Sequence, residues 1–169
     1  EEQKRGNELL IGVMKGMAET DLAGATELMK ELNYGLYLDK AASTLMASVW
    51  AKGEQAAIDW VESFPDGKAR NSAYEALGKR LIREDIDRAV EWVDSMDESE
   101  IKTKIAKETA KAMVILSPEK AADWVARMPA GEARSAGMER VVSQWVELDP
   151  VATAEWLNKF PNDQSIDGA

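Results

Sequence analysis

The chain has 169 residues and contains neither cysteine nor histidine. Without cysteine there can be no disulfide framework, no thiolate metal site and no cysteine nucleophile. Without histidine there can be no imidazole metal ligand and no Ser-His-Asp triad, so acid–base chemistry would fall to Asp, Glu, Lys or Tyr. Long apolar runs are also missing: none reaches the roughly 18 residues typical of a membrane span, and no signal-peptide pattern opens the chain.

Positive charge is scarce as well, with 21 Lys and Arg against 31 Asp and Glu and a formal net charge of −10. This balance argues against a nucleic-acid backbone or an anionic membrane as the main partner. Hydrophobic residues make up 45%, which is enough for the core of one domain of this length. The compartment is left open, although the absent cysteine and a first residue that is not Met favour a processed bacterial protein of the periplasm over a cytoplasmic one.

What the sequence does contain is a repeat marked by tryptophan. Trp60, Trp92, Trp124 and Trp156 are each 32 residues apart, and one step further back lies Leu28 in a matching context. Around each of these five anchors, a small residue, the anchor, its neighbour and a large apolar residue fall at i, i+3, i+4 and i+7. This spacing is typical of one face of an α-helix, and a fixed period of this length indicates a repeat array.

A second apolar series with helical spacing precedes each anchor helix, for example Ile105, Ala106, Met113 and Val114 before Trp124. No segment shows the sustained alternation expected of a strand. We therefore expect an all-α fold, with one domain over residues 1–169 built of five two-helix repeats. Their approximate bounds are 7–38, 39–70, 71–102, 103–134 and 135–166. In each repeat, helix A comes first and helix B carries the anchor.

The connections carry start and stop signals that agree with this periodicity. A residue that can serve as N-cap precedes each helix B, and Pro118 and Pro150 follow at the first helical position, where a missing N–H is harmless. The expected N-caps are Asp21, Gly53, Asp85, Ser117 and Asp149. Helix B is expected to end at Pro65, Pro129 and Pro161.

The anchors are expected to be structural. A small residue opens each helix B and should let a neighbouring helix approach closely, while the anchor three positions on fills the gap between successive hairpins. A buried Trp covers about 150–250 Å², so Trp92→Ala or Trp124→Ala should cost on the order of 3–5 kcal/mol. The alternative is an exposed aromatic stripe that binds a ligand, and the place of the anchors within the apolar face argues against it.

The third unit reads Ala73-Tyr-Glu-Ala-Leu77-Gly78-Lys-Arg-Leu81 and later Ala89-Val-Glu-Trp92, and it resembles the Sel-like branch of the tetratricopeptide-type repeats. That branch combines an A-x-x-x-L-G helix with a K-A-x-x-W helix, and Lys120-Ala121-Ala-Asp-Trp124 is similar to the second half. Here the period is shorter than in Sel-like units, and the Trp lies in the second helix, whereas tetratricopeptide repeats place it in the first. The resemblance implies a right-handed α-α superhelix, or α-solenoid, that acts as a scaffold or adaptor without a cofactor.

Charge is distributed unevenly along the chain. In helices A of the third and fourth units three basic residues stand against one Glu, whereas segment 84–100 holds eight carboxylates against one Arg. Lys104, Lys107 and Lys111 share a helix face, and together with Lys79 they are our candidate basic stripe. Such a stripe would bind an acidic peptide or a terminal carboxylate. The alternative is a solvated helix face, and pairing of these lysines with carboxylates of the next unit would argue for it.

A second row of basic residues lies at the loops. Arg70 and Arg134 recur at the end of a Pro-x-Gly loop, and Lys102 stands at the equivalent position. One interpretation is an anion-binding row. We expect instead that each pairs with a nearby carboxylate or packs its stem over an anchor Trp.

Catalysis and metal binding have little support in the sequence. The densest carboxylate cluster, Glu84-Asp85-Asp87, lies on a helix-entry turn where Asp85 is already the expected cap. No D-x-D-x-D-G loop and no Gly-rich phosphate loop is present. We therefore expect no enzyme, no cofactor and no metal, with a divalent-metal site in residues 84–100 as an alternative.

The function expected from the sequence is a non-catalytic scaffold that binds a protein or peptide, and no nucleic acid. A structural alternative comes from the fifth unit, because the segment from Val151 to Leu157 lacks a following hairpin to cover it. On that alternative the chain is an assembly segment of a larger repeat protein, or its end associates with another copy.

Overall fold

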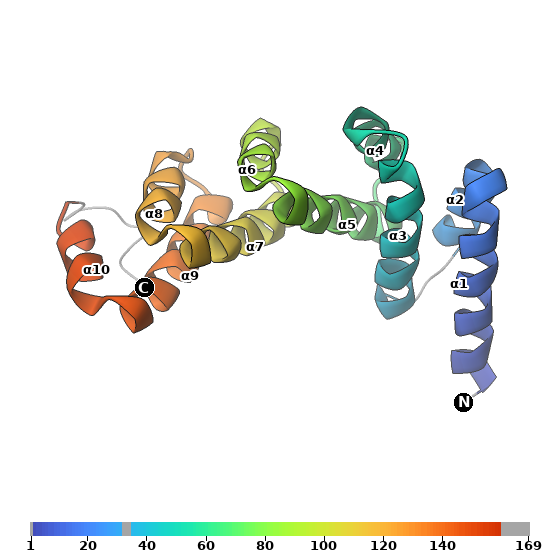
Figure 1. Ribbon diagram of the computed structural model, residues 1–169, viewed down its shortest axis with the longest axis horizontal. Coiled ribbons are helices and arrows are strands. Elements are labelled where there is room, and N and C mark those ends of the chain that lie inside the picture. The colour runs from blue at the N-terminus through green and yellow to red at the C-terminus, as the bar shows by residue number, and fades with distance from the viewer. Residues whose placement is uncertain (1, 32–34, 160–169) are drawn as a thin grey trace. The chain divides into compact units, whose positions relative to one another are not determined.

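The computed structural model describes residues 2–31 and 35–159, and within these ranges the chain forms ten α-helices and no strand. The helices A are α1 (Glu2–Thr20), α3 (Gly35–Trp50), α5 (Lys68–Glu84), α7 (Glu100–Leu116) and α9 (Glu132–Leu148). The helices B are shorter: α2 (Leu22–Lys30), α4 (Glu54–Glu62), α6 (Ile86–Ser95), α8 (Pro118–Arg127) and α10 (Pro150–Leu157). Contacts join mostly neighbouring helices (Figure 1), so the all-α prediction is confirmed and the helix pairs are consistent with a helical-hairpin repeat.

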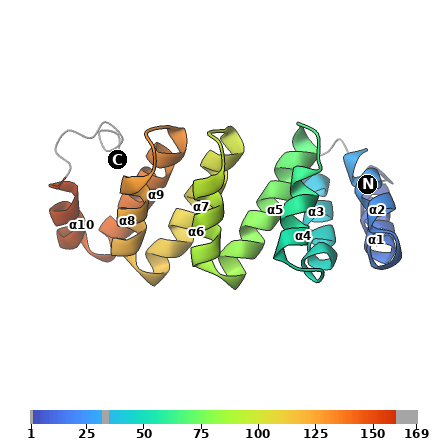
Figure 2. The same cartoon turned by 90° about the horizontal axis from the view of Figure 1, so that it is seen from above.

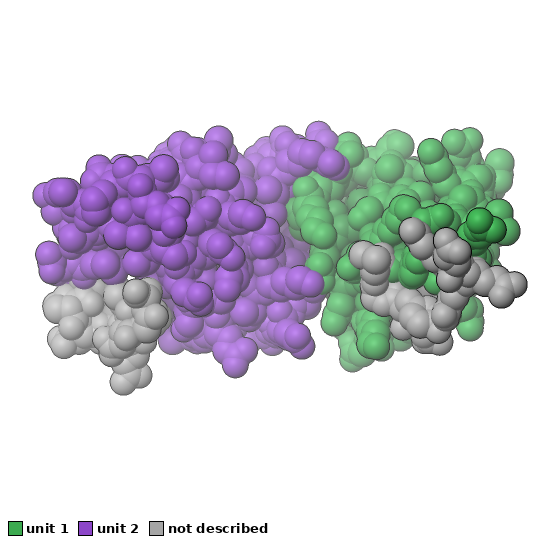
Figure 3. All heavy atoms as spheres, turned by 90° about the horizontal axis from the view of Figure 1, so that it is seen from below, with its two compact units in different colours: residues 1–80 green, residues 81–169 purple. Residues whose placement is uncertain are grey.

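The chain divides into two compact units, residues 1–80 and 81–169, with the division inside α5 (Figure 3). The single domain therefore stays a prediction, and each unit is described by itself.

Every helix A begins three to five residues before the expected start of its repeat. The reason is that the apolar pattern defines the period but carries no signal in the first, solvated turn of the helix. The expected end of the fifth repeat, including Pro161, lies outside the described residues.

Three aspartates cap helices B as the sequence predicts. The side chain of Asp21 accepts a hydrogen bond from the Gly24 N–H at 2.8 Å, and Asp149 accepts one from the Ala152 N–H at 2.9 Å. Asp85 accepts from the N–H groups of residues 87 and 88, at 3.0 and 3.3 Å. Ser117 is the exception, because its hydroxyl makes no capping hydrogen bond to α8.

Asp85 and Ser117 therefore provide a matched pair of substitutions. Asp85→Ala should lower the free energy of unfolding by about 1 kcal/mol, because two N–H groups in the first turn of α6 lose their acceptor. Ser117→Ala should stay within about 0.5 kcal/mol of wild type. Urea denaturation followed by circular dichroism measures both, and equal losses would contradict the capping assignment.

The anchor helices are tightly packed at their N-terminal ends. The small residue that opens each helix B is fully buried in every case, namely Ala25, Ala57, Ala89, Ala121 and Thr153. Among the anchors, Trp60, Trp124 and Trp156 are buried, whereas Leu28 and Trp92 are half-buried.

Two buried anchors also make a polar contact with the preceding helix B. In unit 1 the Trp60 Nε1–H donates to Thr26 Oγ1 on α2 at 3.0 Å, and in unit 2 the Trp124 Nε1–H donates to Asp94 Oδ1 on α6 at 3.0 Å. Each of these tryptophans therefore joins two successive hairpins by packing and by a hydrogen bond.

In unit 2, α9 packs against both helices of the preceding hairpin, α7 and α8. At Gly137 a Cβ atom would stand 2.9 Å from Val125 Cγ1 of α8, so only glycine fits this crossing without a shift. Figure 2 shows that the turns ending α7 and α9 lie along one edge of this unit, and that loops 96–99 and 128–131 lie along the opposite edge. No helix within the described ranges is long and apolar enough to cross a bilayer.

Candidate functional site

The four lysines of the candidate basic stripe are divided between the units. Lys79 belongs to unit 1, is exposed, and has its Nζ 3.9 Å from Glu75 Oε2 on the same helix. In unit 2, Lys107 Nζ lies 3.9 Å from Glu139 Oε2 of α9, the next helix A. This is the pairing that argues against the stripe, and it arises because position 107 faces the neighbouring helix. Lys107 is therefore left out of the site. Lys104 also has a contact of its own, but its side chain and that of Lys111 are exposed on the outer face of α7.

Apolar side chains extend this outer face toward the end of α7. Lys104, Lys111 and Ile115 fall at i, i+7 and i+11, which places them along one side of the helix. Ile115 is exposed, and so is Leu116 after it. Two further exposed apolar residues, Leu148 and Val151, lie where α9 ends and α10 begins. We call the four residues the apolar edge: Ile115, Leu116, Leu148 and Val151.

The apolar edge is not explained by the stacking of repeats. In the third unit, Arg83 and Glu84 stand at the positions of Ile115 and Leu116, one period earlier. Glu84 and Asp87 stand at the positions of Leu148 and Val151, two periods earlier. These are therefore solvent positions of the repeat. Leu116 also has the next hairpin beside it and is still 71% exposed. In the sequence these residues look like ordinary core residues of a helix, so they could not be recognised there as exposed. Aligning the repeats with one another could have identified them, because the equivalent positions of the third unit hold charged residues.

The exposed Val146 of α9 has a different origin. Its equivalent in α7, Val114, is 1% exposed and has α9 beside it, whereas Val146 is 46% exposed and no described helix follows α9 in that position. Val146 thus occupies a position that is buried in α7, which another hairpin follows. It is a suitable control for the apolar edge, because it is apolar and exposed in the same unit.

The members of the apolar edge all lie where α7 and α9 end and where α10 begins. Helices α7 and α9 pack against each other and end on the same edge of unit 2 (Figure 2), with axes about 8–10 Å apart as in packed helices. Leu116 and Leu148 are equivalent residues on these neighbouring ends. A cluster of exposed apolar side chains rimmed by charged ones is typical of a protein-interaction site.

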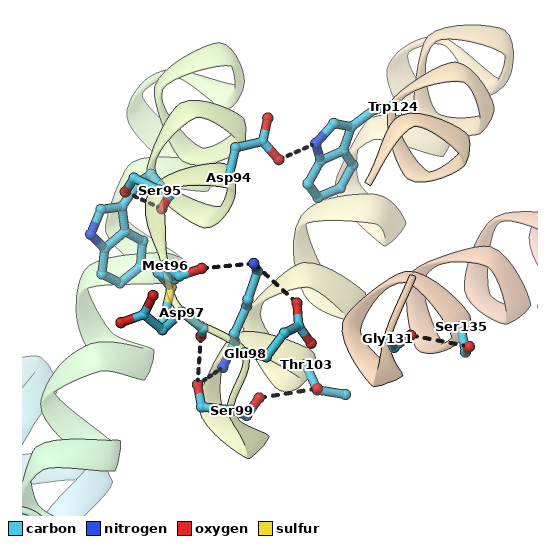
Figure 4. A network of polar contacts seen from close by, with 12 residues as sticks. Asp94, Ser95, Met96, Asp97, Glu98, Ser99, Thr103, Trp124, Gly131 and Ser135 are labelled. Carbon is cyan, nitrogen blue, oxygen red and sulfur yellow. Dashed lines mark hydrogen bonds and ion pairs between the residues drawn. The ribbon is translucent and has the colours of Figure 1, made fainter. Parts of the chain in front are cut away.

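The opposite edge of unit 2 holds a polar network centred on a buried lysine (Figure 4). Lys102 is only 4% exposed; its Nζ donates to the Met96 carbonyl oxygen at 2.7 Å and lies 3.1 Å from Glu98 Oε1. Its backbone N–H donates to the N-cap Ser99. A Cβ atom at Gly131 would stand 2.9 Å from Glu98 Oε2, so this carboxylate also packs against the loop before α9. The network ties two successive loops together.

In unit 1 the equivalent of Lys102 is Arg70. Its guanidinium pairs with Asp66, lies 5.2 Å from the centre of the Tyr74 ring and donates a hydrogen bond to the Tyr74 hydroxyl. The hydrogen bond to Tyr74 and the pairing with Asp66 raise the pKa of Arg70. The expected pairing with a nearby carboxylate is confirmed for Arg70 and Lys102, although Arg70 stacks on Tyr74 and not on an anchor Trp.

Four of the eight carboxylates of segment 84–100 each have a partner of their own. Asp85 caps α6, Glu91 pairs with Arg88, Asp94 accepts from Trp124 and Glu98 pairs with Lys102. Among the residues that the structure describes, no group of three or more carboxylates converges in a way that could hold a metal ion. The geometry therefore gives the metal alternative no support.

Comparison of the chain with known proteins finds no matching family model, no matching curated protein and no matching solved structure. The candidate site consequently rests on the apolar edge and on the outer face of α7. Over its described residues, the chain is an all-helical, repeat-like protein of ten helices packed as consecutive pairs.

Proposed function

We propose that this chain is a right-handed α-solenoid of five hairpins, related to the tetratricopeptide and Sel-like repeats, that binds a segment of another protein without catalysing a reaction. The observation that supports a binding role is the apolar edge of unit 2, where solvent positions of the repeat carry Ile115, Leu116, Leu148 and Val151. Burying an exposed Leu, Ile or Val side chain contributes about 1.5–3 kcal/mol. Even partial coverage of four such residues would therefore favour binding.

Charge on the same surface indicates the chemistry of the partner. Lys104 and Lys111 line the outer face of α7 and lead to Ile115, whereas Glu147 and Asp149 lie on the α9 side of the apolar edge. An acidic segment with apolar side chains fits this arrangement, with its acidic residues along α7 and its apolar residues across the edge. The partner we propose is a peptide of this kind.

Selection from a random peptide library displayed on phage tests the proposal. We expect the enriched peptides to combine Asp or Glu with Leu, Ile or Phe. In fluorescence anisotropy, the double variant L116S/L148S should bind them at least about tenfold more weakly than wild type. K104E/K111E should also weaken binding, and added salt should reduce the difference between this variant and wild type.

Two matched controls separate the site from general effects. V146S removes an exposed apolar side chain outside the apolar edge, and K120E reverses an exposed lysine on α8. Both should bind the selected peptides as wild type does. No enrichment, or equal affinity of wild type and L116S/L148S, would refute the proposed site.

A further inference from the structure

The middle of α9 carries two polar groups that are buried without a partner. Arg140 Nε and Gln144 Oε1 are shielded from solvent, and neither has a hydrogen-bond partner among the residues that the structure describes. Each side chain as a whole is only half-buried, so a ligand can reach the rest of it. A polar group that has lost its water and gained no partner costs free energy, and a ligand that supplies the missing hydrogen bond recovers it.

Three further buried polar atoms without a hydrogen bond lie in different surroundings within the described part of the chain. Thr109 is fully buried in the core of unit 2 and is out of reach of a ligand. Arg80 has its guanidinium 5.2 Å from the centre of the Trp50 ring. Arg134 makes a contact of its own. Arg140 and Gln144 differ from these groups because they are accessible and lie one turn apart on the same helix.

Arg140 and Gln144 belong to a ridge of α9 that leads to the apolar edge. Together with Leu148 they fall at i, i+4 and i+8, a row that follows one side of a helix. Leu148 is a member of the apolar edge and is 65% exposed. The polar pair is therefore continuous with the surface that we propose for peptide binding.

The repeat indicates which neighbour this ridge faces. Two periods before Gln144 stands Arg80, which lies over Trp50, the last residue of α3. Two periods after Trp50 stands Val114, in the last turn of α7. Helix α9 packs against α7 inside unit 2. By this register, Gln144 faces the end of α7, where the apolar edge begins with Ile115.

We propose that Arg140 and Gln144 determine which peptides the apolar edge accepts, an inference that rests on the proposed function. Arg140 binds the carboxylate of one Asp or Glu of the peptide by charge-assisted hydrogen bonds. Gln144 Oε1 accepts a backbone N–H from the stretch between this acidic residue and the apolar residue on Leu148. The acidic residue thus recognised is a specific one, whereas the α7 lysines attract negative charge in general.

The distance along the ridge defines the peptide pattern. Arg140 and Leu148 are eight positions apart, which corresponds to about 12 Å along a helix. An extended peptide advances about 3.3 Å per residue, so about three or four residues cover this distance. We therefore expect Asp or Glu to stand about three or four positions from the Leu, Ile or Phe that packs on Leu148. The proposed function alone requires no fixed spacing.

Peptides selected on the wild-type chain test this inference. Their sequences should show the acidic and the apolar residue at the fixed spacing. In fluorescence anisotropy, R140M, which keeps the apolar stem of the side chain, should bind them at least about tenfold more weakly than wild type. Q144M should bind about fivefold more weakly. When the acidic residue of the peptide is replaced by its amide, R140M and wild type should bind alike, because the interaction is absent from both.

Stability and a matched control separate recognition from a structural role. R140M and Q144M should unfold in urea at no lower concentration than wild type, because each removes a buried polar atom that has no partner. R127M changes an exposed arginine of α8 and should bind as wild type does. If R140M binds as tightly as wild type while L116S/L148S does not, the proposed function stands and this inference is overturned. Selected peptides without a fixed spacing would also overturn it, and a selection that enriches no peptide would overturn both.

Discussion

Replacing Trp124 by alanine is expected to lower the free energy of unfolding by about 3–5 kcal/mol. The side chain is only 3% exposed, and it fills the space between α8 and the preceding helix α6. Most of the loss should come from the cavity, because Asp94 is exposed and water can replace the indole N–H as its partner. Trp124→Phe, which keeps most of the ring volume, should therefore lose clearly less.

Trp92 is the matched control, since it holds the same position in the preceding hairpin but is only half-buried. Although the sequence predicts the same cost at both positions, the structure lowers the expectation for Trp92→Ala. Urea denaturation monitored by circular dichroism compares the three variants. Equal losses at Trp92 and Trp124 would contradict the difference in burial between the two side chains.

The second large effect is expected at Lys102. Lys102→Glu places a carboxylate at a 4% exposed position, beside Glu98 and the Met96 carbonyl oxygen, and should cost about 3–5 kcal/mol. Lys102→Met keeps the apolar stem and loses the hydrogen bond and the ion pair, so a loss of about 1–2 kcal/mol is expected.

Lys104→Glu makes the same charge change on an exposed position of the same helix. Its effect on the free energy of unfolding should stay within about 1 kcal/mol. Chemical denaturation of all three lysine variants gives the comparison. If Lys102→Glu lowered the free energy of unfolding no more than Lys104→Glu does, the contacts of Lys102 with Met96 and Glu98 would not be what stabilises the loop before α7.

The regular features of the fold could be predicted because each has a local cause. The 32-residue period, the caps Asp21, Asp85 and Asp149 and the burial of the small residues in helices B all follow from spacing and residue type. The starts of helices A could not be placed, because a solvated first turn carries no apolar signal. Likewise, the half-buried state of Trp92 depends on packing that an apolar pattern does not describe.

The candidate site was predicted only in part. Helical spacing puts Lys104 and Lys111 on one face of α7, and both are exposed, but the pairing of Lys107 with Glu139 depends on how two helices A lie side by side. The apolar residues Ile115 and Leu116 are exposed because they occupy positions that hold the charged residues Arg83 and Glu84 in the third unit. Periodicity alone cannot distinguish such residues from the core.

The two hydrogen-bonded anchors show which part of the contact differs from one hairpin to another. Trp60 reaches an acceptor 34 residues back, whereas Trp124 reaches one 30 residues back, so the two acceptors differ by about one helical turn in register. Thr26 can serve because its hydroxyl accepts from Trp60 while it donates to the Leu22 carbonyl oxygen. The indole therefore keeps its place in the 32-residue period, while the acceptor of its N–H lies about one turn further along the neighbouring helix in one case than in the other.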